Sequence, residues 1–310
     1  MSAIRVEALA KINLGLRVLY RRPDNFHELR TVFQTISLAD RIDLQYRRSG
    51  GPAIELTCNR AELSGLHNLA ARAARRLLEA TGNIGRVSLQ LEKRIPVGAG
   101  LGGGSSDAAA VLWALGSLLR PLPPRELLFH LAAELGSDVP YFLLGGRALG
   151  VGRGTEVYPL ADSPARWLLV VAPSIAVSTA EAYRRLAPHL TSSRWEDKID
   201  RFCSVICVPE QGPARDFKLD PENDFEAVVF RLYPELERLK ARLGELGARP
   251  ALLCGSGSAL FGLFADRRQA LRARDSFDLD DGDRFVVKTV GRADYQTRWR
   301  GWLDNKSTGR

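Results

Sequence analysis

Polar and apolar residues follow a strand-like pattern through much of the first sixty positions. Residues 5–10, 12–19, 29–37, 41–46 and 54–58 alternate or form short apolar runs rich in β-branched side chains, which predicts strands. Residues 68–80, NLAARAARRLLEA, instead place apolar side chains at helical spacing, and Gly82 follows them. A helix is therefore predicted there, with a further strand over residues 86–93.

A glycine-rich segment, residues 96–106, follows that strand and precedes AAAVLWALGSLL. Ser105, Ser106 and Asp107 are residue types that cap helices, so we predict that a helix begins at the serines. A second helix is predicted over residues 125–135, ending at Gly136. Residues 137–140 then form a predicted turn that carries Asp138 and leads into residues 141–144.

The pattern restarts near residue 167 with the apolar strand WLLVVAP and a predicted helix over residues 179–186. Residues 192–221 are polar and irregular, and we interpret them as an insertion or mobile loop. Helices over 224–231 and 235–246, strands over 249–254 and 259–264, a further helix and a strand over 284–290 are predicted beyond it. The tail, residues 295–310, carries Trp299 and Trp302 among basic residues, and either a docking segment or a disordered terminus accounts for it.

The length of 310 residues exceeds what one compact core usually serves. Together with the restart of the pattern, it predicts two α+β domains, residues 1–160 and 161–310. The hydrophobic share of 45% and charged share of 26% are those of ordinary globular proteins. No apolar run approaches the length of a bilayer span and the start lacks a signal peptide, so a cytoplasmic protein with no membrane partner is expected.

Four cysteines in this length indicate neither a disulfide framework nor a zinc ribbon, and no metal site built from side chains is predicted. The net charge of +8 invites a nucleic-acid hypothesis. The basic residues, however, are scattered and acidic residues lie near most of them. A phosphate-rich small substrate or a general surface bias explains the charge as well, and no nucleic-acid partner is expected.

The segment PVGAGLGGGSSD has the chemistry of a phosphate-binding loop. Its glycines let the backbone approach a polyanion and direct N–H groups toward it, and the helix that follows presents its positive dipole end to the same place. The Ser105 and Ser106 hydroxyls can bond phosphate or a water on magnesium. The spacing excludes a Walker loop, a dinucleotide fingerprint and the protein-kinase signatures. A flexible surface loop is the alternative.

Phosphoryl transfer also needs a group that deprotonates the acceptor hydroxyl, and a carboxylate beside a lysine can do so. Asp138 and Lys11 are the candidates. From the residues alone, a surface lysine and a turn-forming aspartate remain the alternative.

Three segments together carry a family resemblance: AKINLGLRVLYRRPDNFHELRTVFQTISLADRIDL, PVGAGLGGGSSDAAAVL and LLCGSGSALFGLF. In content, order and spacing they resemble the three motifs of the GHMP kinase superfamily, over about residues 8–265. The resemblance implies an N-terminal domain like the second domain of ribosomal protein S5, a ferredoxin-like C-terminal domain, a site in the cleft between them, and ATP with Mg²⁺. ATP would be held by Asn68 and Leu69 beside adenine and by the loop residues Pro96, Val97, Gly98, Ala99, Gly100, Leu101, Gly102, Gly103, Gly104, Ser105 and Ser106.

The run RPDNFHEL is similar to one branch of the superfamily, whose acceptor is a cytidine diphosphate derivative of methylerythritol. This resemblance implies that Asp138 is the base and that Lys11 assists it. The substrate would be contacted by Asn13, Phe26, His27, Asp138, Thr179, Tyr183, Gly255, Ser256 and Gly257. Phe26 and Tyr183 would stack on the pyrimidine and His27 would bond its edge, whereas His67, His130 and His189 are expected to be structural.

Two positions depart from the family pattern. Asn25 stands where glycine is usual, a position that asparagine tolerates better than other residues, and Cys254 replaces a Ser or Thr. A homoserine or mevalonate type of GHMP kinase, and a non-catalytic nucleotide- or RNA-binding descendant, remain the alternatives. The intact Lys11, Asp138 and loop favour a working enzyme, and both a monomer and a homodimer fit the sequence.

Overall fold

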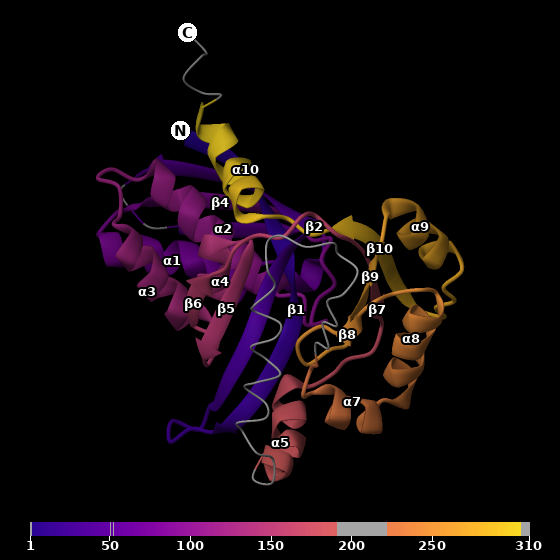
Figure 1. The fold of residues 1–310 in the computed structure, drawn as a ribbon. Helices are drawn as coiled ribbons and strands as arrows, with labels where there is room; N and C mark the ends of the chain where they lie inside the picture. The colour runs from indigo at the N-terminus through magenta and orange to yellow at the C-terminus, as the bar shows by residue number, and fades with distance from the viewer. Residues whose placement is uncertain (1, 50, 52, 191–221, 305–310) are drawn as a thin grey trace.

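A computed structural model describes residues 2–49, 51, 53–190 and 222–304 of the chain (Figure 1). The elements of the first half are β1 (Ser2–Arg21), β2 (His27–Arg48), β3 (Ala53–Cys58), η1 (Ala61–Leu63), α1 (Leu69–Thr81), β4 (Gly85–Glu92), α2 (Gly103–Leu118), α3 (Arg125–Leu135), α4 (Val139–Leu144), β5 (Arg147–Gly152) and β6 (Glu156–Pro159). Those of the second half are β7 (Trp167–Pro173), α5 (Thr179–Leu190), α7 (Glu226–Leu232), α8 (Pro234–Glu245), β8 (Ala251–Leu253), β9 (Leu260–Phe264), α9 (Arg267–Asp275), β10 (Gly282–Lys288) and α10 (Arg292–Asp304). The predicted α+β class is confirmed.

One long antiparallel hairpin, β1 and β2, replaces the four shorter strands predicted for this region. The break predicted at residue 11 is a shift of register within continuous strands, between Leu9 and Lys11, and a further shift lies between Asn13 and Gly15, inside a predicted strand. No turn-forming residue stands at the first break, so a bulge absorbs the change of pattern. The hairpin turns at Asn25, whose φ of 67° is the left-handed conformation expected of a glycine substitute.

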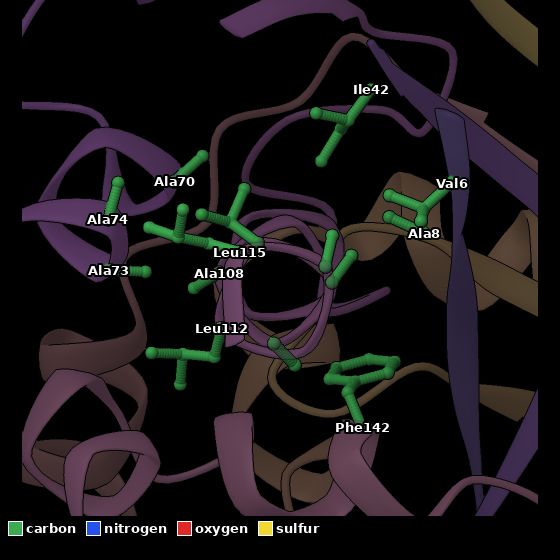
Figure 2. Close-up of a cluster of buried hydrophobic side chains, with 14 of the residues drawn as sticks. Val6, Ala8, Ile42, Ala70, Ala73, Ala74, Ala108, Leu112, Leu115 and Phe142 are labelled. Atoms are coloured by element: carbon green, nitrogen blue, oxygen red, sulfur yellow. The ribbon is translucent and has the colours of Figure 1, made fainter. Parts of the chain in front are cut away.

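The first sheet has the order β3-β4-β2-β5-β6, with β1 paired to β2. Strands β5 and β6 were not predicted, because Gly150, Gly152 and Gly154 interrupt the apolar pattern there. One face of the sheet is covered by helices, and the tight packing of α1 and α2 uses small side chains. Figure 2 shows Ala70, Ala73 and Ala74 of α1 facing Ala108 and Leu112 of α2 across this core.

The second sheet is antiparallel with the order β10-β7-β9-β8. A core between the two sheets joins Ile12 of β1 and Ile36 of β2 to Val170 of β7 and Phe261 of β9. The hairpin therefore packs against both halves of the chain. The division at residue 160 stays a prediction.

The helix α10 returns from the second sheet to the first (Figure 1). Tyr295 is fully buried and donates to the carbonyl of Phe142 in α4, while Trp299 Nε1 donates to the carbonyl of Glu7 in β1. Within the predicted tail, the described part up to residue 304 is therefore a helix packed on the chain itself. The rest of the tail and the predicted insertion over 192–221 lie outside the described residues.

No helix in the part of the chain that the structure describes is long and apolar enough to cross a membrane.

Candidate active site

A cavity of about 1360 Å³ lies where the hairpin, the phosphate loop, α4, α5 and the loop after β8 meet. Nearly all of the predicted site residues line it: Lys11, Asn13, Phe26, His27, Asn68, Leu69, Pro96, Val97, Gly98, Ala99, Gly100, Leu101, Gly102, Gly103, Gly104, Ser105, Asp138, Thr179, Tyr183, Gly255 and Ser256. Ser106 and Gly257 are not among the lining residues. The fold thus brings residues from both halves of the chain to one place.

The phosphate loop has glycine at three positions whose backbone conformation disfavours other residues. Gly98, Gly100 and Gly102 all have positive φ. A Cβ at Gly100 would lie 1.9 Å from the carbonyl oxygen of Cys254, so the backbone of this loop touches the loop after β8 directly. The loop is also held by a bond from the backbone N–H of Lys11 to the carbonyl of Leu101, 3.0 Å long.

Helix α2 begins at Gly103, two residues earlier than predicted, with Gly102 as its N-cap. The serines are therefore in its first turn. Ser105 lines the cavity, whereas the buried Ser106 hydroxyl donates to the carbonyl of Leu9 over 2.7 Å. No side chain caps this helix end, and Gly103, Gly104 and Ser105 of its first turn line the cavity, so its free N–H groups and the positive end of its dipole lie at the cavity.

Asp138 and Lys11 lie together at the cavity wall. The Lys11 ammonium group is 3.4 Å from Asp138 Oδ2. Asp138 occupies the N-cap position of α4 but makes no side-chain cap bond, so its carboxylate is available to the cavity. The predicted turn leads directly into this short helix, because Pro140 fits the first turn of a helix.

Lys11 is buried and its ammonium group is fixed by a chain of hydrogen bonds. It donates to Asn13 Oδ1 over 2.8 Å, Asn13 Nδ2 donates to Thr31 Oγ1 over 2.7 Å, and the Thr31 hydroxyl donates to the carbonyl of Gly15. These bonds lie beside the shift of register between Asn13 and Gly15, and together they hold the Lys11 ammonium group in place.

The far end of the cavity contains aromatic side chains. The rings of His27 and Tyr183 stack with centroids 4.8 Å apart and planes at 19°. His27 Nε2 is buried without a hydrogen-bond partner among the described residues. Burial lowers the pKa of His27 and the Arg21 cation lowers it further, which favours a neutral imidazole that can both donate and accept. Phe26 is 48% exposed and the Arg153 guanidinium lies 4.6 Å from its ring centre.

The loop after β8 closes the cavity from the second half of the chain. A Cβ at Gly255 would lie 3.6 Å from Lys11 Nζ, and the Ser256 and Thr179 hydroxyls share a hydrogen bond of 2.8 Å. Cys254 is fully buried, and burial raises the pKa of its thiol to about 12. This residue therefore contributes a neutral, packed side chain where the family pattern has a hydroxyl.

Several lining residues were not predicted. His67, expected to be structural, lines the cavity, and so do Lys93, Asp107 and Arg153. The buried Asn223 donates to the carbonyls of Leu253 and Gly255 and so holds both sides of the closing loop. The charge and spacing of these residues in the sequence did not predict a place in the site, because the residues that they contact are distant in sequence.

Family models match both halves of the chain. The model described as the GHMP kinases N terminal domain matches residues 68–146, and the model described as GHMP kinases C terminal matches residues 214–279.

The full length of the chain is similar to curated proteins named 4-diphosphocytidyl-2-C-methyl-D-erythritol kinase. The protein of that name from Solibacter usitatus is 48% identical over 299 residues, which are 95% of this chain and 91% of that protein. The protein from Thermus thermophilus is 42% identical over 306 residues, 97% of each chain.

Solved structures agree with these relatives. A crystal structure of 4-(cytidine 5'-diphospho)-2C-methyl-D-erythritol kinase is 39% identical, covers 93% of this chain and all of its own, and superposes with a TM-score of 0.74. A homoserine kinase from Cytophaga hutchinsonii superposes nearly as well, with a TM-score of 0.73 over 94% of this chain and 95% of its own, at 19% identity. That second similarity shows the shared fold alone.

Proposed function

The chain belongs to the GHMP kinases and, among them, to the 4-diphosphocytidyl-2-C-methyl-D-erythritol kinases, and from this premise we propose its reaction. It is an ATP-dependent small-molecule kinase that transfers the γ-phosphate of ATP to the 2-hydroxyl of 4-diphosphocytidyl-2-C-methyl-D-erythritol. The products are the 2-phosphate and ADP, and the step belongs to non-mevalonate isoprenoid precursor biosynthesis.

One observation supports this substrate above other alcohols. The buried, unpartnered His27 Nε2 lies beside Tyr183 in the cavity that also contains the phosphate loop. A buried polar atom without a partner costs free energy, so a ligand that bonds it gains correspondingly. The edge of a cytosine provides such a partner, and its face fits the neighbouring aromatic rings. Neither homoserine nor mevalonate has a base to place there.

The chemistry in this proposal is carried by Asp138 and Lys11. Asp138 accepts the proton of the 2-hydroxyl as the oxygen attacks the γ-phosphorus. Lys11, fixed by Asn13 at 2.8 Å, lies beside that carboxylate and balances the charge that gathers on the transferred group. The loop after β8 encloses the acceptor, and the N-terminus of α2 with the backbone N–H groups of the phosphate loop binds the ATP phosphates.

Magnesium fits this cavity as a companion of ATP. Among the described residues, no three His, Cys, Asp or Glu side chains gather into a metal-binding group. Mg²⁺ commonly keeps several waters and binds through substrate phosphates with few protein ligands. Bound together with ATP, Mg²⁺ would neutralise phosphate charge, and the Ser105 hydroxyl, which lines the cavity, could hold one of its waters. A cytoplasmic location and a monomeric or homodimeric state remain expectations from the sequence.

The test is ADP formation by the purified protein with ATP, magnesium and one acceptor at a time. We expect ADP with 4-diphosphocytidyl-2-C-methyl-D-erythritol and none above background with homoserine, mevalonate or no acceptor. Turnover of homoserine or mevalonate instead would retain the kinase and overturn the substrate. Binding of ATP without turnover of any acceptor would favour the non-catalytic alternative.

A further inference from the structure

Beneath the phosphate loop lies a buried charge cluster that the proposed reaction does not use. The Lys93 ammonium group forms ion pairs with Asp40 of β2 and, over 2.8 Å, with Asp107 of α2. All three side chains are at least 95% buried. Lys93 and Asp107 also line the cavity. A Cβ at Gly103, the first residue of α2, would lie 3.1 Å from Lys93 Nζ, so the cluster touches the start of the helix.

The cluster fixes the segment that enters the phosphate loop. Asp40 Oδ1 accepts the backbone N–H groups of Arg94 and Ile95, over 2.6 and 2.8 Å. The Asn59 side chain holds Lys93 at both its N–H and its carbonyl group. The polar backbone groups just before Pro96 are thereby tied to side chains on neighbouring segments. The position of the loop depends on this cluster.

The cluster contains two carboxyl groups and one ammonium group, so with both carboxyls ionised it carries a net negative charge. Both oxygens of Asp40 accept hydrogen bonds, Oδ2 from Lys93 and Oδ1 from the backbone of Arg94 and Ile95. Asp107 differs, because its Oδ1 is buried without a partner among the described residues. Burial raises the pKa of Asp107 to about 8; the Asp40 carboxylate also raises it, and Lys93 opposes the shift.

The groups facing Asp107 come from the elements packed on α2. Asp40 comes from β2 and Lys93 from the end of β4. On β1 and α4, Lys11 and Asp138 pair with each other. The paired charges of α1 and α3 are at the surface: Arg76, Glu79 and Glu134. Asp107 is thus the carboxyl group of the cluster whose burial favours its protonated form.

We propose that Asp40, Lys93 and Asp107 are positioning residues for the phosphate loop, and that ATP binds most tightly when Asp107 holds a proton. The reason is electrostatic: an ionised Asp107 gives the buried cluster one negative charge more than Lys93 balances, close to the helix end that must accept the polyphosphate. This inference rests on the proposed function, because it requires that ATP binds at this loop. It does not depend on which acceptor is phosphorylated.

The test is ATP binding measured by calorimetry between pH 7.5 and 9.5, where phosphate groups with a second pKa near about 6 are already ionised. For the unmodified protein, we expect the Kd for MgATP to rise roughly tenfold across this range. At pH 8.5, we expect the protein to take up a fraction of a proton when ATP binds. The number of protons is obtained by comparing the binding enthalpies measured in two buffers of different ionisation enthalpy. In Asp107→Asn, which keeps an oxygen for Lys93 but cannot titrate, both effects should vanish.

Asp43→Asn is the matched control, because Asp43 lies on the same strand as Asp40 but pairs with Arg5 at the surface. It should behave as the unmodified protein does. A pH-independent Kd without proton uptake in the unmodified protein overturns the proposal whether or not the Asp107 variant folds. Equal pH dependence in Asp107→Asn overturns it as well. A failure to bind ATP at all would overturn the proposed function together with it, whereas loss of acceptor turnover with ATP binding intact would leave this inference standing.

Discussion

At the scale of single residues, the chemistry depends on side chains that local structure leaves free. Asp138 is in an N-cap position, where an aspartate normally bonds the helix backbone, yet it faces Lys11 instead. The cavity therefore receives a carboxylate on a rigid helix start. Its 31% exposed side chain leaves room for a hydroxyl to approach.

Replacing Asp138 with Asn tests the base. We expect kcat to fall by about 10²- to 10⁴-fold, the usual contribution of a positioned general base, while the KM for ATP stays within about threefold. Steady-state ADP formation gives both numbers, and an unchanged melting temperature is the control for folding. A kcat within about tenfold of the unmodified protein would remove Asp138 from that role.

The sequence could indicate a site residue only where that residue belongs to a recognisable motif or interacts with residues close to it in sequence. Lys11, Asp138, His27 and the glycine loop are in motifs, and they line the cavity. The cluster beneath the loop has its members at positions 40, 93 and 107. A lysine between two distant aspartates looks like ordinary surface charge until the fold buries it, so sequence reasoning missed it.

At the scale of elements, the glycine-rich loop before α2 and the loop after β8 are held by side chains from outside them. Asn223 bonds the carbonyls of Leu253 and Gly255, and its own segment pairs with β1 through Leu16. The loop after β8 is thereby fixed relative to the strand that carries Lys11. A Cβ added at Gly255 would lie 3.6 Å from Lys11 Nζ, so this loop lies close to Lys11.

Asn223→Ala should release this loop. We expect kcat/KM for the acceptor to fall roughly 10- to 100-fold, because each lost bond to a buried carbonyl costs about 1–3 kcal/mol, part of it in the placement of Gly255. The matched control is Glu226→Gln, which alters the bond to the N–H of Leu253 but leaves Gly255 alone. The control should lose stability in thermal unfolding without a comparable loss of turnover. If the Asn223→Ala and Glu226→Gln variants were equally stable and lost equal activity, Asn223 would act only on folding.

Element boundaries were predicted well where the pattern is strongly periodic and less well where geometry is irregular. The helix predicted over 68–80 is α1, Leu69–Thr81, with Asn68 as its cap. The four short strands were wrong in number, because bulges rather than turns interrupt β1 and β2. A bulge shifts the alternation of side chains as a turn does, so periodicity alone cannot separate the two.

At the scale of the molecule, segments distant in sequence assemble one site. The hairpin β1–β2 packs against both sheets, and α10 returns from the second sheet to hold α4, the helix whose N-cap is Asp138 (Figure 1). Such long-range returns leave no signal in local periodicity, which is why the tail stayed undecided from the sequence. Membership in the kinase family accounts for the assembly as a whole.

The most direct measurement is phosphorus NMR of the product formed from ATP and 4-diphosphocytidyl-2-C-methyl-D-erythritol. The account predicts one new phosphomonoester signal, equal in amount to the ADP formed, with the diphosphate signals of the acceptor retained and the new group coupled to no proton because it is on the quaternary C2. Inorganic phosphate in place of that signal, or a phosphomonoester coupled to protons at another carbon, would contradict the assigned reaction.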